Sequence, residues 1–267
     1  MRLPPPVDPD PRAPLVRANP VAKLAAALIL LTALFLSLDG VTASVVLVGL
    51  ALTLPFAGLP IGALLRRSWL IGLAAVTVLL ANVLFAAEQA GPALVAVGPL
   101  RIGAGTLVDA TGLGLRVLAI AAGGVLAMAT TEPTRLADAL IQQLRVSPRF
   151  ALGALAALRL VPLLLAEWQT IGMARRARGV DAGRSPLAAV RLWAGRVVSL
   201  LVRAVRRASR LALAMEARGL GAMPCRTNAR ESSLGIGDVA WIVGAAMLAA
   251  TAMGVSLWLG TWRPLLG

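Results

Sequence analysis

The six-residue pattern Ala-x-x-Ala-Arg-Gly occurs twice in this chain, as the phrase Ala-Arg-Arg-Ala-Arg-Gly at 174–179 and as the phrase Ala-Met-Glu-Ala-Arg-Gly at 214–219. Alanine is the strongest helix former, and a glycine just past a helix end adopts the left-handed conformation cheaply. Each phrase therefore predicts the last turn of a helix with one arginine at its tip, where five donors stand in a fixed fork near the negative end of the helix dipole. One copy is ordinary helix chemistry. Two copies predict a pair of tips that dock on a protein surface.

The overall composition is that of a membrane protein. Of the 267 residues, 58% are apolar and 14% charged, and the mean hydropathy is +0.83, which is far more apolar than a soluble domain. A net charge of +14 suggests nucleic-acid binding in a soluble protein, but aromatic residues that stack on bases amount to 4% and tyrosine is absent. We therefore expect a lipid membrane around this chain and no nucleic-acid partner.

The residues needed for metal, redox or nucleotide chemistry are scarce. The chain has no histidine and one cysteine, Cys225, so an internal disulfide is excluded and zinc and haem lack their usual ligands. The single lysine, Lys23, does not follow the glycine-rich pattern of a P-loop. We expect no enzyme activity, no catalytic residue and no cofactor or metal site in this chain. If ATP drives its work, another subunit must bind that ATP.

Five apolar segments predict transmembrane helices, each long enough to cross a bilayer at about 1.5 Å per residue. They are Val21–Leu38, Val41–Ala57, Trp69–Ala87, Ala110–Thr130 and Val239–Gly260. Basic residues precede the first segment, and residues 130–238 hold 17 arginines against seven acids. The positive-inside rule then places the N-terminus and residues 130–238 in the cytoplasm and the C-terminus outside.

Smaller features complete this topology. Arg66 and Arg67 are expected in the loop before the third span, and residues 88–109 in an outer loop. Asp39 and Gly40 form a polar break between the first two spans. Arg116 lies near the outer end of the fourth span, where its side chain can reach the interface.

One further apolar run, Phe150–Ala166, is expected to lie along or under the membrane rather than cross it. Arg159 sits within the run, Pro162 interrupts the helix, and Glu167 follows within a turn. The fold class is thus an all-α polytopic membrane protein with five spans and three amphipathic cytoplasmic helices. Its expected domains are a proline-rich lead-in at 1–20, transmembrane helices 1–4 at 21–130, coupling helices at 131–238, and the last transmembrane helix and tail at 239–267.

The last cytoplasmic helix, 187–218, carries a basic stripe. Five arginines fall within an arc of about 80° at 100° per residue: Arg196, Arg203, Arg207, Arg210 and Arg218. Such a stripe is either a solvated face or a contact with anionic lipids.

Across residues 129–226 the sequence resembles the T component of energy-coupling-factor transporters, the family that includes the cobalt-type transmembrane proteins. The matching stretches are Ala129–Pro133 with Leu136 and Ala139-Leu140, Arg159–Pro162 with Glu167, the two phrases at 174–179 and 214–221, Arg226-Thr227, and near the start Asn19-Pro20-x-x-Lys23-Leu24. The proline-rich lead-in departs from the family and has no assigned role.

The resemblance implies a non-catalytic subunit of a bacterial plasma-membrane importer. In that family the T component joins two ABC-type ATPases to a small membrane S component that binds the substrate. Carried over to this chain, the residues that would dock on the ATPases are Ala177, Arg178, Gly179, Ala217, Arg218 and Gly219. ATP-driven movement would shift the two helices and reorient the S component. Cobalt or nickel, biotin and other vitamins all remain open as substrates.

Two other functions compete with this interpretation. A stand-alone secondary transporter is expected to show inverted repeats and ionisable residues within its spans, whereas here the repeat is direct and cytoplasmic, and the ionisable residues avoid the spans apart from Arg116 and Lys23, each near a span end. An intramembrane enzyme would need histidine or paired carboxylates within a span, and the sequence has neither.

Overall fold

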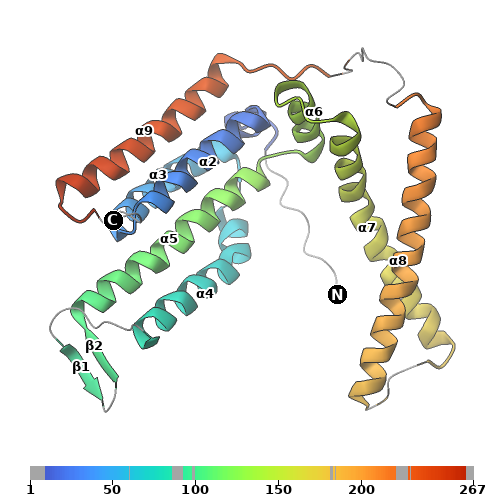
Figure 1. The fold of residues 1–267 in the computed structure, drawn as a ribbon, viewed down its shortest axis with the longest axis horizontal. Helices are drawn as coiled ribbons and strands as arrows, with labels where there is room; N and C mark the ends of the chain where they lie inside the picture. The colour runs from blue at the N-terminus through green and yellow to red at the C-terminus, as the bar shows by residue number, and fades with distance from the viewer. Residues whose placement is uncertain are drawn as a thin grey trace. The chain divides into compact units, whose positions relative to one another are not determined.

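The computed structural model describes residues 10–59, 61–85, 93–97, 100–180, 183, 185–220, 228 and 230–262. In these ranges the chain folds into helices and one β-hairpin (Figure 1). The elements are α1 (Pro14–Arg17), α2 (Pro20–Leu36), α3 (Gly40–Ala57), α4 (Ile61–Phe85), β1 (Ala93–Val97), β2 (Leu100–Gly103), α5 (Ala104–Ala129), α6 (Pro133–Gln143), α7 (Pro148–Ala177), α8 (Pro186–Ala217) and α9 (Ile236–Trp258). They form two compact units, one of residues 1–136 with 233–267 and one of residues 137–232.

The central helix of the first unit is α5. Helices α2, α3 and α4 pack against it, and α9 packs against α2 and α3 (Figure 1). Leu34, Val46 and Ala252 are buried in the core between them. Gly40 and Gly112 bring α3 and α5 into backbone contact, because a Cβ on either glycine would lie 3.0 or 3.1 Å from the Cα of the other. Small residues allow this close approach of helices in a lipid environment.

Side-chain caps fix the starts of α2 and α3. Asn19 accepts a hydrogen bond from the backbone N–H of Val21 (3.0 Å), and Pro20 occupies the first helical position. Asp39 accepts one from the backbone N–H of Thr42 (2.8 Å). The predicted polar break between the first two spans is therefore confirmed at Asp39, which lies between α2 and α3 and caps α3. Gly40 is the first residue of α3.

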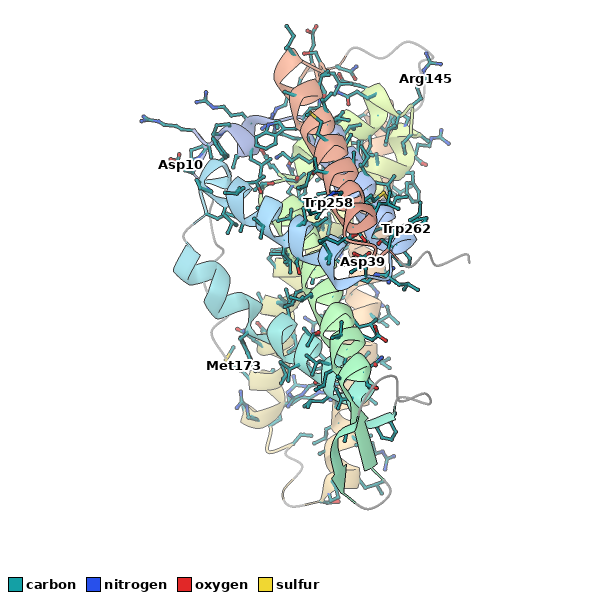
Figure 2. All side chains as sticks on the ribbon, turned by 90° about the vertical axis from the view of Figure 1, so that its left-hand side faces the viewer. Asp10, Asp39, Arg145, Met173, Trp258 and Trp262 are labelled. Carbon is teal, nitrogen blue, oxygen red and sulfur yellow. The ribbon has the colours of Figure 1, made fainter. Side chains whose placement is uncertain are left out.

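Helices α2 and α9 begin at the same end of this unit. The backbone N–H of Asn19 donates to a carboxylate oxygen of Asp238 in the first turn of α9 (2.6 Å). Asp39, after α2, and Trp258, at the end of α9, lie toward the other end (Figures 1 and 2). Residues before α2 and before α9 thus lie on one side of the spans, as the predicted topology requires. The assignment of that side to the cytoplasm remains a prediction from the arginine distribution.

Each of the five predicted spans is helical over most of its described residues, and three of the helices end one or two residues before the predicted bound, at Leu36, Ala129 and Trp258. By length and composition α3, α5, α7 and α9 can cross a membrane, whereas α2 and the apolar part of α4, Trp69–Phe85, are shorter. α7 meets these criteria although the sequence argument places it outside the bilayer. Only 6% of its apolar window is buried inside the protein. The placement of α7 along or under the membrane stays a prediction.

Two predicted loops are partly wrong. Arg66 and Arg67 lie within α4, which begins at Ile61, because arginine is a good helix former and does not end a helix. The segment expected as an outer loop contains the antiparallel pair β1–β2, and α5 begins directly after it at Ala104 rather than at 110. The strands β1 and β2 have five and four residues, and strands this short are harder to recognise in a sequence than a long apolar helix.

Pro162 does not interrupt α7, which is continuous from Pro148 to Ala177. A proline inside a helix removes one hydrogen bond and crowds the carbonyl four residues earlier. The leucine- and alanine-rich turns around Pro162 have high helix propensity and carry the helix past it. α3 likewise continues past Pro55.

Candidate docking site

The first phrase ends α7 in a Schellman motif. Ala177 is the last helical residue, Arg178 is the C-cap, and Gly179 is left-handed with φ of 71°. The N–H of Gly179 donates to the carbonyl of Arg176 (3.0 Å), and the N–H of Val180 donates to the carbonyl of Arg175 (3.0 Å). These two bonds satisfy carbonyls that the helix end leaves without intrahelical partners.

The second phrase ends α8 with the same geometry. Arg218 is the C-cap and Gly219 is left-handed with φ of 83°. The N–H of Gly219 donates to the carbonyl of Glu216 (2.9 Å), and the N–H of Leu220 donates to that of Met215 (3.0 Å). The prediction that both phrases are last turns with glycine stops is therefore confirmed.

The backbone motif alone does not mark a binding site. The end of α9 shows the same pair of bonds around Gly260, which has φ of 64°, but its C-cap is Leu259. What the ends of α7 and α8 add is a guanidinium at the C-cap position. The two tips are thus alike in backbone and in the charged group that they present.

Both tips are open to a partner. The six residues predicted to dock are exposed, namely Ala177, Arg178, Gly179, Ala217, Arg218 and Gly219. A Cβ added to Gly179 or Gly219 would meet no atom within 4 Å, so their positive φ, and not crowding, requires glycine here. With no side chain at these positions, another protein can approach the helix ends closely.

The two long helices of the second unit, α7 and α8, cross as an antiparallel pair. Arg175 of α7 donates from Nη1 to the carbonyl of Leu192 on α8 (2.9 Å), and the rings of Trp168 and Trp193 meet edge to face at 6.5 Å. Gly195 leaves room for the Arg175 guanidinium, because a Cβ there would lie 3.2 Å from Nη1. Sequence reasoning missed this role of Arg175. The available signal was that the two phrases differ at this position, Arg175 in one and Met215 in the other.

The basic stripe of α8 is not uniform. Arg207 forms an ion pair with Glu167 of α7, with Nη2 and Oε1 3.0 Å apart. Arg196 also faces α7, since its Nη1 lies 3.4 Å from where a Cβ on Gly172 would stand. The interpretation of the whole stripe as a solvated or lipid-contacting face is wrong for these two arginines. Arg203 and Arg210 are exposed and remain available for either role.

The antiparallel crossing places the two tips at opposite ends of this helix pair (Figure 1). Arg178 ends α7 close in sequence to the start of α8, and Arg218 lies at the far end of α8. With 32 residues in α8, the rise along that helix alone is about 48 Å. One small surface patch therefore does not reach both tips, and each needs a separate surface.

Helix α8 contains no buried residue within this chain. Large apolar side chains are exposed along both helices, including Phe150, Leu158, Val161, Leu187, Val190, Leu201, Val205 and Leu213. A helix of this length without a fully buried residue gains little from tertiary packing, and exposed apolar surface of this extent is typical of contact with another protein or with lipid. The exposed apolar side chains of α7 and α8 therefore form a surface that suits another protein or lipid.

Comparison with known proteins agrees with these features. The family model described as cobalt transport protein, CbiQ, matches residues 11–226. The energy-coupling factor transporter transmembrane protein EcfT of Heliobacterium modesticaldum is 33% identical over 218 residues, which cover 77% of this chain and 79% of that protein. EcfT of Bacillus subtilis is 32% identical over 168 residues, or 60% of this chain and 63% of that one.

EcfT of Limosilactobacillus fermentum is 35% identical over 142 residues, so that this chain matches about half the length of that relative, 53%. Fold and similarity together define a mainly helical, multi-pass membrane protein of the transporter class. The chain belongs to the CbiQ family and is a transmembrane T component of an energy-coupling-factor transporter.

Proposed function

We propose that this chain is the non-catalytic coupling subunit of an importer in the bacterial plasma membrane. Arg178 and Arg218 each dock on one of two ABC-type ATPase subunits, which bind the ATP. The helices α7 and α8 pass the ATPases' movement to a small membrane S component, and that component takes up a vitamin or a transition-metal ion.

The observation that carries the proposal is the pair of matched tips at opposite ends of crossing helices. Both tips have left-handed glycines, exposed C-cap arginines and the same two capping bonds. A separation set by a helix of about 48 Å suits two separate partners of the same kind. Two copies of one ATPase fold supply two equivalent acidic surfaces, and a planar guanidinium suits such a surface better than an ammonium does.

The exposed apolar surface of the second unit supports a membrane-embedded partner. Leu187, Val190 and Leu201 of α8 are all more than half exposed. A hydrophobic S component, or the lipid around it, would cover this surface and gain about 25 cal/mol for each Å² of apolar area buried.

The environment of Arg116 disfavours a stand-alone secondary transporter. Its Nη2 donates to the carbonyl of Phe35 (3.1 Å), and the guanidinium lies 5.4 Å from the centre of the Phe35 ring. Arg116 thus joins α5 to the end of α2, close to the predicted outer ends of both spans, and its reach into the interface stays a prediction. Transport by this chain alone would need an ionisable residue on a substrate path.

The proposal is tested by tagging the chain in its native host and identifying the proteins that copurify in mild detergent. Two ATPase chains and one small membrane protein are the expected result. A chain that is recovered without ATPases, at an expression level that supports transport, would overturn the proposal and favour the secondary transporter.

A further inference from the structure

The chain leaves the first unit after Leu136 and returns to it at Ser233. We call these two passages of the chain between the units the outgoing and the returning crossing. Both contact the same short stretch near the N-terminus, residues 16–23. We call Val16, Arg17, Asn19 and Lys23 the anchor cluster. It contains the Asn19-Pro20-x-x-Lys23 motif, to which the proposed function gives no role.

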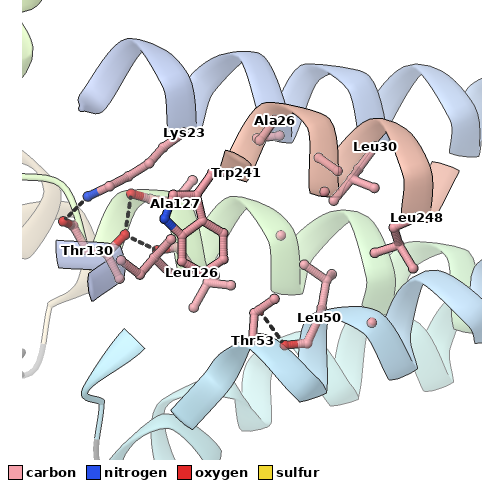
Figure 3. A pocket seen from close by; sticks show the side chains of 16 residues that line it. Lys23, Ala26, Leu30, Leu50, Thr53, Leu126, Ala127, Thr130, Trp241 and Leu248 are labelled. Carbon is pink, nitrogen blue, oxygen red and sulfur yellow. Dashed lines mark hydrogen bonds between the residues drawn. The ribbon is translucent and has the colours of Figure 1, made fainter. Parts of the chain in front are cut away.

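The outgoing crossing is held by two cations. Arg135, at the start of α6, donates from Nη1 to the carbonyl of Val16 (3.1 Å) and from Nη2 to the carbonyl of Arg17 (2.9 Å). Lys23 donates from Nζ to the carbonyl of Thr130 at the end of α5 (2.7 Å), as Figure 3 shows. Lys23 and Thr130 are both buried, so water does not compete for this bond.

The returning crossing is held by Asn19. Its side-chain Nδ2 donates to the carbonyl of Ser233 (3.1 Å), and its backbone N–H donates to Oδ1 of Asp238 (2.6 Å). The other carboxylate oxygen of Asp238 accepts from the N–H of Gly235 (2.8 Å), which caps the start of α9. One residue of the anchor cluster therefore holds both the returning segment and the first turn of the last span.

The same two segments are joined within the second unit. Gln142 of α6 donates to the carbonyl of Arg230 (2.7 Å) and accepts from the N–H of Ser232 (2.8 Å). Gln143 donates to the carbonyl of Ser232 (3.1 Å). Side chains of α6 thus join the outgoing segment to the returning segment within the second unit, and the anchor cluster contacts both segments within the first unit.

An apolar cavity of about 300 Å³ lies beside the anchor cluster. Lys23, Thr130 and Trp241 line it at one end, and Leu50 and Leu248 line it further along (Figure 3).

We infer that the anchor cluster, with Arg135 and Asp238, transmits movement of the second unit to the ends of α5 and α9. Arg135 and Asn19 act as positioning residues: a pull on either crossing passes through short hydrogen bonds to the spans instead of being absorbed by a loose linker. This inference rests on the proposed function, because the ATPases supply the pull.

The test uses the full complex with its ATPases in liposomes, after Cys225→Ser, with spin labels on Val108→Cys of α5 and Trp258→Cys of α9. Both positions are exposed. We expect the distance between the labels to shift when ATP is bound. Arg135→Gln should reduce the fraction of shifted complexes about fivefold or more, the lower end of usual coupling between sites, while ATP hydrolysis and ATPase retention continue. Should Arg135→Gln not accumulate, Arg135→Lys keeps the charge but has one donor nitrogen in place of the two that Arg135 uses, and it carries the comparison.

Arg116→Gln is the matched control, because Arg116 also donates a hydrogen bond to a backbone carbonyl and is also half-buried, but lies away from both crossings. It should leave the ATP-dependent shift in place. An unsubstituted complex that shows no shift, or a loss with Arg116→Gln equal to that with Arg135→Gln, would overturn the inference and leave the proposed function standing. If the ATPases do not copurify with the unsubstituted chain, the proposed function falls and this inference with it.

Discussion

Replacing the two tip arginines is the sharpest perturbation that the structure offers. Arg178 and Arg218 are exposed, and their guanidinium groups form no hydrogen bond or ion pair with other residues that the structure describes. Exposed substitutions of this kind change the free energy of unfolding by about 0.5 kcal/mol or less. Any larger effect of Arg178→Ala or Arg218→Ala therefore belongs to a contact with a partner.

The size of that effect follows from the kind of contact. One charge-assisted hydrogen bond to an acidic surface contributes roughly 1.5 to 3 kcal/mol. Losing it raises the Kd for one ATPase about 10- to 150-fold. Because the tips are separated by a helix of about 48 Å, their effects should add in Arg178→Ala with Arg218→Ala, to roughly 3 to 6 kcal/mol.

The assay is retention of ATPases on the tagged, detergent-solubilised chain, together with uptake by cells. Each single variant should keep much of the complex and weaken transport, and the double variant should lose both. Lysine at either tip should also impair function, since an ammonium does not reproduce a planar fork.

Arg203→Ala is the matched control, because Arg203 is exposed on α8 and carries the same charge away from the tip. It should release far less ATPase than either tip variant. Equal loss from Arg203→Ala and Arg218→Ala would refute the reasoning and favour a contact of the whole stripe with lipid.

Three further outcomes are expected. A cysteine at Ser185, in a chain with Cys225→Ser, should stay unlabelled by an impermeant reagent added outside intact cells, and labelling there would contradict the cytoplasmic placement of residues 130–238. The purified chain should hydrolyse no ATP, because it lacks a P-loop, and activity in a preparation shown to be free of ATPase subunits would contradict this. Gly112→Ala should destabilise the first unit by about 1 to 3 kcal/mol, since its Cβ would press on the Gly40 backbone, whereas Gly124→Ala, with no atom within 4 Å of the added Cβ, should be neutral or slightly stabilising in a thermal-unfolding measurement.

Local signals made much of this fold predictable. Long apolar runs indicated the spans, and proline and glycine marked helix ends: Pro186 occupies the first turn of α8 after its N-cap, and Gly179 and Gly219 follow the helices that they end. The two tips are recognisable for the same reason, because every residue that forms one lies within a single turn.

Contacts between distant segments were not predictable in this way. Asn19 and Asp238 are separated by 219 positions, and neither sequence neighbourhood indicates the other. The same holds for Arg175, which reads as part of a tip phrase but donates to the carbonyl of Leu192 on the next helix. Arginine has five donors and a long stem, so its partner is set by the tertiary fold and not by its own neighbours.

The geometry of the crossing predicts that losing one tip weakens transport more than it weakens retention of the complex. The contacts between α7 and α8 include small residues, Gly172 and Gly195, each facing an arginine of the other helix, and both tips lie beyond these contacts, where a change of crossing angle moves them most. If the pivot lies near the middle of a helix of about 48 Å, a rotation of about 10° moves a tip by about 4 Å. On the proposed function, a partner bound at Arg218 alone would still hold the complex together but would leave α7 free to follow the rotation of α8, so the crossing angle would change less. With Arg178 held as well, movement of the two ATPases would become a full change of angle for an S component lying on these helices, so we expect the strongest transport when both tips are bound.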